Sequence, residues 1–239
     1  MTNPMPVLPP CAIVTGTSSG IGQAIALKLL SEGWHVHGID MAPSKLKNPL
    51  LTAWQLDLTQ TDALANTLDQ IVSQHQPQVL VHAAGVLRVG SLGSLDMQAG
   101  HFMWQLHVEV ATQLANKVLP IMQQTGKGRM VLVGSRVSSG IAGRSQYAAS
   151  KAALLSLARS WAAECIAYGV TVNVVSPAAT DTPMLQDPAR ADTTPRLPPL
   201  GRLIQPDEVA ALVAYLTRPE AAAITGQDIA ICGGSSVQR

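Results

Sequence analysis

Short apolar runs recur along the chain, separated by segments long enough to form helices. The runs occupy residues 12–14, 36–39, 79–81, 130–133, 170–175 and 228–231. Continuous rather than alternating hydrophobicity is typical of parallel strands that helices cover on both faces. We therefore predict an α/β fold with a doubly wound parallel sheet.

Composition limits the number of domains and the kinds of partner. The 239 residues, 47% of them hydrophobic, predict one domain at residues 11–239, after a proline-rich, flexible arm at residues 1–10. A formal net charge of +1 with 13% charged residues offers no basic surface for nucleic acid. No run reaches the ~18 apolar residues that a membrane span needs. We expect a small-molecule substrate, with no nucleic-acid or membrane partner.

The cysteines give an indication of compartment and of metal binding. Cys11, Cys165 and Cys232 are odd in number and widely scattered. Their spacing is typical of neither a disulfide framework nor a zinc site. We therefore predict no metal and a reduced, cytoplasmic setting.

Two segments indicate surfaces that meet other molecules. Residues 183–206 carry six prolines and follow the sixth predicted strand, which is typical of a substrate lid, although a passive surface loop would have the same composition. The segment from Tyr147 to Tyr168 is apolar almost all round, which predicts burial on more than one side. One side can pack on the sheet and the other on a second copy, so we expect a homo-oligomer.

A glycine-rich turn lies between the first predicted strand and the helix after it. In Thr15-Gly16-Thr17-Ser18-Ser19-Gly20-Ile21-Gly22, the glycines allow a tight turn and a close approach of the backbone to a pyrophosphate. The N-terminus of the helix favours the negative charge of that group. By itself, the turn also suits an ordinary connection between strand and helix.

An acidic residue after the turn indicates which dinucleotide would bind. Asp40 ends the second predicted strand, where its carboxylate can accept hydrogen bonds from the adenine ribose and would repel a 2′-phosphate. Ser19 and Met41, the neighbouring positions that could hold such a phosphate, are not basic, although Lys45 is close in sequence. The pattern favours NAD over NADP.

Two further strand ends add to the predicted nucleotide site. Asp57, followed by Leu58, closes a third strand and could receive the adenine amino group, or it could cap the next helix. Small residues, Ala83-Ala84-Gly85, end the fourth strand and allow a close backbone approach. Together these residues would line the adenosine half of a pocket.

Tyr147 and Lys151 are four residues apart, which places them on the same face of a helix. A nearby ammonium favours the phenolate over the phenol. A tyrosine tuned in this way can exchange a proton with an alcohol.

Taken together, these motifs resemble those of the short-chain dehydrogenase/reductase family, in the family's order and from Cys11 to about Val237. The resemblance rests on the glycine turn, Asp57, Ala83-Ala84-Gly85, a serine before Tyr147-x-x-x-Lys151, and Asn173-Val174-Val175-Ser176-Pro177. It implies a single-domain Rossmann fold, usually dimeric or tetrameric, and NAD(P)-dependent interconversion of an alcohol and a carbonyl.

The resemblance also implies roles for individual residues. Tyr147 resembles the catalytic acid/base, Lys151 the residue that lowers the pKa of that tyrosine and holds the nicotinamide ribose, and Ser135 the hydroxyl that positions substrate. The interval from Ser135 to Tyr147 is one residue shorter than in many members, so Ser138 or Ser139 could take that place. The positions that correspond to nicotinamide contacts are Pro177, Ala178, Thr180 and Thr182.

Two histidines depart from the family pattern. His82 replaces the asparagine usual before Ala-Ala-Gly, which ties strands together. His107 stands where the family usually has the asparagine that holds a proton-relay water. An imidazole could sustain that relay with an altered pH profile because it titrates near neutral pH, or His107 could be a buried structural residue.

The substrate is less constrained. Short strings such as Pro199-Leu200-Gly201-Arg202 resemble the members that aromatise dihydrodiols, such as 2,3-dihydro-2,3-dihydroxybenzoate dehydrogenase. Arg88, Arg144 and Arg190 could pair with a substrate carboxylate, or could be ordinary surface arginines. A small cyclic alcohol or dihydrodiol is therefore expected. The alternatives are a 3-oxoacyl-thioester reductase and an NAD-binding regulatory or scaffold protein that has lost catalysis.

Overall fold

The computed structural model describes residues 9–187 and 196–237. The predicted arm at residues 1–10 therefore lies outside the described residues except for Pro9 and Pro10, and so do residues 188–195 of the predicted lid. No helix in the described ranges is both long and apolar enough to cross a bilayer.

The strands form one parallel sheet in the order β3-β2-β1-β4-β5-β6-β7. Their bounds are β1 (Cys11–Thr15), β2 (His35–Asp40), β3 (Leu51–Gln55), β4 (Pro77–His82), β5 (Gly128–Val133), β6 (Val170–Pro177) and β7 (Asp228–Ile231). The order reverses direction between β1 and β4. This single-domain, doubly wound sheet confirms the predicted fold class.

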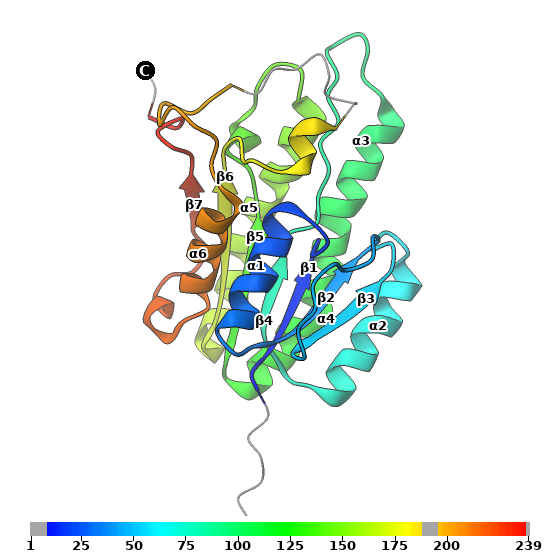
Figure 1. The fold of residues 1–239 in the computed structure, drawn as a ribbon, viewed down its shortest axis with the longest axis vertical. Coiled ribbons are helices and arrows are strands. Elements are labelled where there is room, and N and C mark those ends of the chain that lie inside the picture. The colour runs from blue at the N-terminus through cyan, green and yellow to red at the C-terminus, as the bar shows by residue number, and fades with distance from the viewer. Residues whose placement is uncertain (1–8, 188–195, 238–239) are drawn as a thin grey trace, which may run out of the picture.

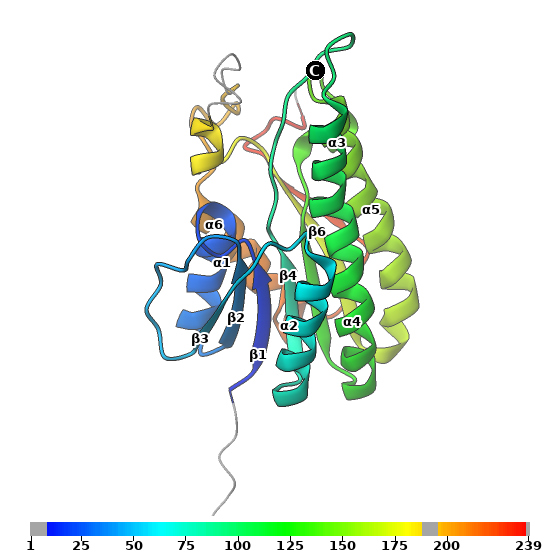
Figure 2. The same cartoon turned by 90° about the vertical axis from the view of Figure 1, so that its right-hand side faces the viewer.

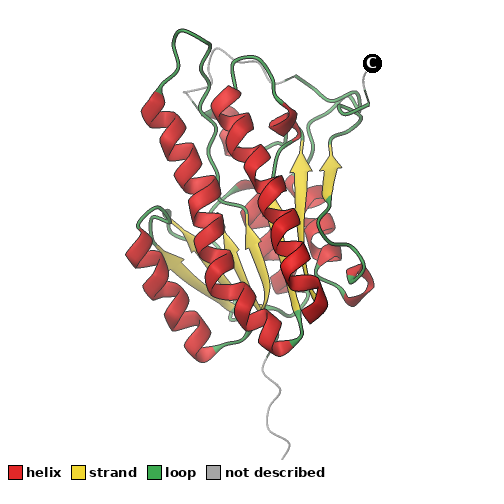
Figure 3. Ribbon diagram, turned by 180° about the vertical axis from the view of Figure 1, so that it is seen from behind, coloured by secondary structure: helices red, strands yellow, loops and turns green. Residues whose placement is uncertain are grey.

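Helices cover both faces of the sheet (Figure 1 and Figure 2). One face carries α1 (Gly20–Ser31) and α6 (Pro206–Leu216), which pack against each other. The opposite face carries α2 (Thr61–Gln74), α4 (Val110–Thr125) and α5 (Ser145–Cys165), as Figure 3 shows from behind. The short helix α3 (Met97–Trp104) continues into α4 through a π-helical turn, Gln105–Glu109.

The two faces of the sheet define two apolar cores. Side chains alternate between the faces along each strand, so Ile13 and Leu80 meet the α2, α4 and α5 side while Val14 and Val81 meet the α1 and α6 side. All four are fully buried. The strands are therefore apolar without interruption, which is the pattern that identified them in the sequence.

The structure adjusts three details of the prediction. The third strand ends at Gln55, so Asp57 lies two residues beyond it. In the single chain, α5 buries one face, with Leu154, Ala158 and Ala162, while Trp161 on its flank is only partly buried. Within residues 183–206, Pro183–Gln186 form a short 3-10 helix and Pro206 begins α6.

Candidate active site

A cavity of about 670 Å³ opens where the carboxyl ends of the strands meet. Open α/β sheets bind ligands at such a reversal of strand order, here between β1 and β4. The cavity lies within the usual volume range of small-molecule sites. Its walls bring together all of the residues that the sequence assigns to the cofactor, namely Gly16, Ser18, Ser19, Gly20, Ile21, Gly22, Asp40, Asp57, Leu58, Ala83, Ala84, Gly85, Tyr147, Lys151, Pro177, Ala178, Thr180 and Thr182.

The glycine turn connects β1 to α1 under tight steric constraint. Gly16 has φ +77°, and a Cβ there would lie 2.8 Å from the Ala84 nitrogen. A Cβ at Gly22 would lie 2.1 Å from the Gly16 oxygen. The Ser19 side chain makes no capping hydrogen bond, so the first turn of α1 presents its amides to the cavity. This turn fits the pyrophosphate of a dinucleotide.

Asp40 occupies the end of β2 beside that turn. Its Oδ2 accepts a hydrogen bond from the Ser18 amide at 2.9 Å, and its Oδ1 accepts one from the Ala42 amide at 2.9 Å. These bonds fix the carboxylate on the cavity wall. Among the described lining residues, the positive charges belong to Arg136, Arg144, Lys151 and Arg196, none of them on β2 or in the loop after it.

Asp57 forms a local turn before α2 and lines the cavity, but it is not the N-cap of that helix. The carboxylate Oδ1 accepts hydrogen bonds from the amide and the hydroxyl of Thr59, at 2.9 and 2.8 Å. This turn organises the approach to α2, whose N-cap is Gln60. Asp57 and Leu58 nevertheless line the cavity, so a ligand can still reach them.

His82 joins the end of β4 to its surroundings. The Thr15 hydroxyl donates to His82 Nδ1 at 2.9 Å and accepts from the amides of Ala83 and Ala84 at 3.1 Å each. His82 Nε2 then donates to the Leu106 carbonyl at 3.1 Å. Burial lowers the pKa of His82 to about 3, so the ring is neutral. The histidine therefore makes the strand-tying contacts expected of an asparagine at this position.

Tyr147 and Lys151 lie on the buried face of α5 and are 8% and 4% exposed. Lys151 Nζ is 6.0 Å from the centre of the Tyr147 ring and donates to the Val133 carbonyl at 2.8 Å. Burial lowers the pKa of Lys151 to about 7. Both residues line the cavity. The charge of Lys151 is therefore sensitive to its surroundings.

Ser135 follows β5 and shares the cavity wall with Tyr147. Its Oγ accepts the Val137 amide at 3.4 Å, which starts the 3-10 turn Arg136–Ser139. Ser138 and Ser139 instead face a separate, smaller pocket. The geometry thus separates the three serines that the sequence left as alternatives.

His107 lies behind the cavity wall rather than on it. The ring is fully buried in the π-helical turn and meets the Tyr147 ring edge-on, with centres 5.6 Å apart. His107 Nε2 accepts the Val86 amide at 3.1 Å, which leaves Nδ1 to donate to Ser150 Oγ at 2.9 Å. The Ser150 hydroxyl donates in turn to the Tyr147 carbonyl at 2.9 Å.

The electrostatics of His107 bear on the predicted relay. Burial, and then the charge of Lys151, lower the pKa of His107 well below 6.5. Both ring nitrogens are already hydrogen-bonded, so the ring remains neutral and fixed at neutral pH. This arrangement suits a positioning residue behind Tyr147 better than a group that titrates near neutral pH.

The three arginines that could pair with a substrate carboxylate lie in different places. Arg88 lies off the cavity wall and forms an ion pair with Asp187, with Nη1 and Oδ2 2.8 Å apart. Arg144 lines the cavity. Arg190 lies outside the described residues. Arg136 and Arg196 also line the cavity, although neither belongs to a motif that predicts this position.

Part of the cavity wall is made of apolar side chains that the sequence did not single out. These side chains come from the loop after β4, from α3, from the loop before α5 and from the 3-10 helix after β6. They are Leu87, Phe102, Val137, Ile141, Met184 and Leu185. Phe102 is 37% and Ile141 is 41% exposed, although both are large apolar residues. Leu87, Val137 and Met184 of this wall pack in one cluster with Tyr147.

The nucleotide cavity and the Ser135, Tyr147 and Lys151 set define an oxidoreductase that interconverts CH–OH and carbonyl groups. The chain belongs to the short-chain dehydrogenase/reductase family. The family model described as "Enoyl-(Acyl carrier protein) reductase" matches residues 16–236.

Individual relatives share nearly the whole chain. The 3-oxoacyl-(acyl-carrier-protein) reductase FabG of Salmonella typhimurium is 33% identical over 234 residues, and that of Pseudomonas aeruginosa is 35% identical over 237 residues. Each match covers 93% of this chain and 96% of the relative.

Solved structures agree on the fold. An aldohexose dehydrogenase of Thermoplasma acidophilum has a TM-score of 0.88 at 27% identity and covers 97% of this chain and 95% of its own. An actinorhodin polyketide ketoreductase with NADPH has a TM-score of 0.84 at 26% identity and covers 95% of this chain and 97% of its own.

Proposed function

We propose that the protein is an NAD-dependent oxidoreductase that interconverts a secondary alcohol and a ketone on a small cyclic substrate, such as a cyclic alcohol or a dihydrodiol. The observation that carries the cofactor choice is the Asp40 carboxylate, fixed on the cavity wall by two backbone amides. An adenine ribose with free hydroxyls can donate to it, whereas a 2′-phosphate would meet its negative charge.

The chain's own residues supply the proton chemistry. When bound, the nicotinamide supplies hydride transfer. In alcohol oxidation, the Tyr147 phenolate takes the hydroxyl proton at Oη, and in the reverse direction the phenol returns it. The Lys151 ammonium favours the phenolate, and the Ser135 hydroxyl orients the reacting oxygen. The apolar wall around Phe102 and Ile141 would contact an apolar portion of the substrate.

A test of the cofactor assignment compares NADH with NADPH in the direction of ketone reduction. We expect kcat/KM to be higher with NADH by about tenfold or more, the range of a hydrogen bond to a charged group. Asp40→Asn keeps an oxygen for the Ser18 amide and removes the charge, so it should narrow this preference. Asp62→Asn, at an exposed position in α2, serves as the control. A wild-type preference for NADPH would refute the assignment.

A test of the catalytic assignment uses Tyr147→Phe. We expect kcat to fall about 100- to 10,000-fold, as for loss of a general acid/base, while NADH still binds. Tyr168→Phe is the matched control because Tyr168 is 55% exposed and outside the cavity. Turnover by Tyr147→Phe at the wild-type rate would remove the phenol from the mechanism.

The second candidate function is reduction of a 3-oxoacyl thioester, which the names of the curated relatives favour. Rates over cyclic alcohols, dihydrodiols, aldohexoses and 3-oxoacyl thioesters discriminate between the two. We expect the cyclic substrates to give the highest kcat/KM because short strings of the sequence resemble those of the dihydrodiol dehydrogenases. A higher value with the thioesters would establish the second candidate.

We also propose self-association through α5. Leu155, Leu157 and Trp161 remain only partly buried in the single chain. A second copy packed there would bury them and stabilise the helix that carries Tyr147. Light scattering at micromolar concentration should give the mass of a dimer or tetramer, and a monomeric mass would refute the proposal.

A further inference from the structure

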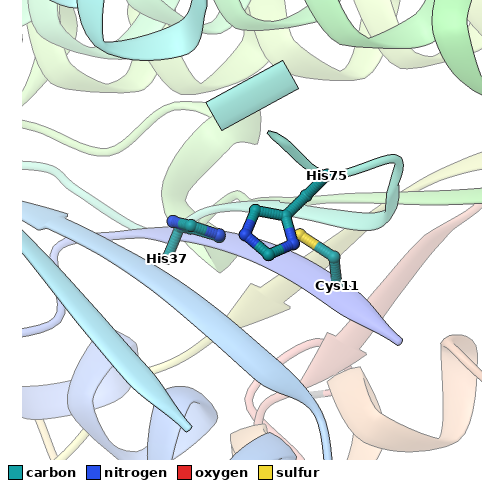
Figure 4. A group of neighbouring side chains, drawn as sticks. All are labelled: Cys11, His37 and His75. Carbon is teal, nitrogen blue, oxygen red and sulfur yellow. The ribbon is translucent and has the colours of Figure 1, made fainter. Parts of the chain in front are cut away.

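A cysteine and two histidines come together at the end of the sheet opposite the cavity. Cys11 begins β1, His37 lies on β2, and His75 follows α2 directly. One potential metal-ligating atom of each residue lies within 4.8 Å of the other two. Figure 4 shows the His75 ring between the His37 ring and the Cys11 sulfur. The cavity begins past Thr15, about 13 Å along β1, so the cluster has no part in that site.

The hydrogen bonds of His37 leave one nitrogen unsatisfied. The Trp54 indole N–H donates to His37 Nδ1 at 3.1 Å, so the proton of the neutral ring lies on Nε2. His37 is 2% exposed, and its Nε2 is a buried atom without a hydrogen-bond partner. Leaving a buried polar group unsatisfied is unfavourable, and such a group calls for an explanation. A missing ligand at Nε2 would supply one.

We propose that Cys11, His37 and His75 bind a Zn²⁺ ion through Sγ and one nitrogen of each imidazole. Thiolate and imidazole are the ligands that zinc prefers, and three protein ligands leave a fourth position for water. Tetrahedral coordination needs ligand atoms roughly 3.3–3.8 Å apart, so the cluster must contract by about 1 Å. His75 can make this movement because it is only partly buried and lies in the connection between α2 and β4.

Binding of the ion displaces a proton from Cys11 and moves a proton within the His37 ring. Burial raises the pKa of Cys11 to about 12, so the metal-free thiol is protonated and its proton passes to solvent when sulfur binds the ion. Burial lowers the pKa of His37 to about 4, so its ring is neutral throughout. Coordination through Nε2 moves the ring proton to Nδ1, where it faces the Trp54 N–H. Metal binding must therefore break the hydrogen bond between Trp54 and His37.

The competing interpretation is a packed cluster of neutral rings. His35 stacks on His37 with centres 4.7 Å apart and meets His75 at 4.8 Å. Its Nε2 is hydrogen-bonded to Thr52 Oγ1 at 2.9 Å, and His35 is not part of the group of ligand atoms that lie within 4.8 Å of one another. Packing alone accounts for the stacked rings, but it leaves His37 Nε2 unsatisfied. A zinc ion would satisfy His37 Nε2 in exchange for the hydrogen bond from Trp54, and it would tie β1, β2 and the end of α2 together.

Cobalt provides the direct test because Co²⁺ replaces zinc and absorbs light. Titration of the full-length, metal-free protein with Co²⁺ should give one equivalent with a thiolate-to-cobalt charge-transfer band and the visible bands of tetrahedral cobalt, and Zn²⁺ should displace it. Cys11→Ser should abolish the charge-transfer band. Cys165→Ser and Cys232→Ser are the controls and should keep it. Absence of the band in the wild type, or its persistence in Cys11→Ser, would overturn the proposal.

Stability gives a second readout that does not depend on activity. Zn²⁺ at about 100-fold over its Kd should raise the unfolding midpoint of the wild type by about 5–10 °C. His75→Gln, at a partly buried position, should lose this shift, whereas His101→Gln should keep it. Equal shifts in the wild type and His75→Gln would refute this ligand set.

Trp54→Phe separates coordination from nonspecific metal binding. Without the indole N–H, the His37 proton moves to Nδ1 without losing a hydrogen bond, so Zn²⁺ affinity should rise by about three- to tenfold. Trp34→Phe is the control, since Trp34 lies outside the cluster. Weaker binding by Trp54→Phe would contradict coordination through His37 Nε2.

Discussion

Lys151 makes the stability of the nucleotide-free protein depend on pH. Burial lowers its pKa from 10.5 to about 7 in the folded state. Between these values the unfolded chain holds a proton that the folded chain lacks, so the free energy of unfolding rises with pH. The gain amounts to about 2 kcal/mol between pH 7.5 and 9. Lys151→Met should lose this rise in the free energy of unfolding, because methionine fills a similar volume without a charge.

The assay is urea unfolding of both proteins, without nucleotide, at pH 7.5 and 9. Cys11 acts in the opposite direction near pH 9, because its pKa is raised to about 12 and the unfolded thiol ionises first. Its contribution is common to both proteins and cancels in the difference between them. Lys127→Met, at an exposed position after α4, should behave as the wild type. An equal change in wild type and Lys151→Met would refute the reasoning.

Three further outcomes test the site. Lys151 is expected, from the family resemblance, to donate to the nicotinamide ribose. Its ammonium would then be favoured in the complex, so binding of NADH at pH 8 should take up as much as one proton; calorimetric heats that do not vary with the buffer would contradict this. His107→Asn should leave the shape of the pH–rate profile unchanged between pH 6 and 9, since the pKa of His107 is already well below 6.5. Arg88→Ala should raise the KM of a carboxylated substrate by less than about fivefold, because Asp187 already pairs with this partly exposed arginine. A hundredfold rise would make Arg88 the carboxylate anchor.

Features set by local sequence could be predicted. The glycine turn depends on backbone conformations within a few residues, and Tyr147 and Lys151 need only a helical spacing. The strands could be recognised as continuous apolar runs because helices cover both faces of the sheet. The third strand ends two residues before Asp57, although the apolar Leu56 next to it favours a longer strand.

Features that depend on distant partners could not be predicted. Arg88 resembles any free arginine until the fold brings Asp187 to it from 99 residues away. Phe102 and Ile141 look like core residues, and only tertiary structure turns them toward a cavity. Cys11, His37 and His75 are too widely spaced to form a motif, and the pairing of β1 with β2 and β4 is what brings them together.

The two histidines that depart from the family pattern are linked through the peptide between Leu106 and His107. His82 holds the carbonyl of Leu106, and the next residue, His107, holds the Val86 amide. Exchanging either imidazole alone for a shorter amide would shift this peptide and weaken the other contact. The pair is therefore expected to be epistatic: the double change to asparagine should be better tolerated than the two single changes suggest, and an evolutionary path between the two states would pass through a less fit intermediate.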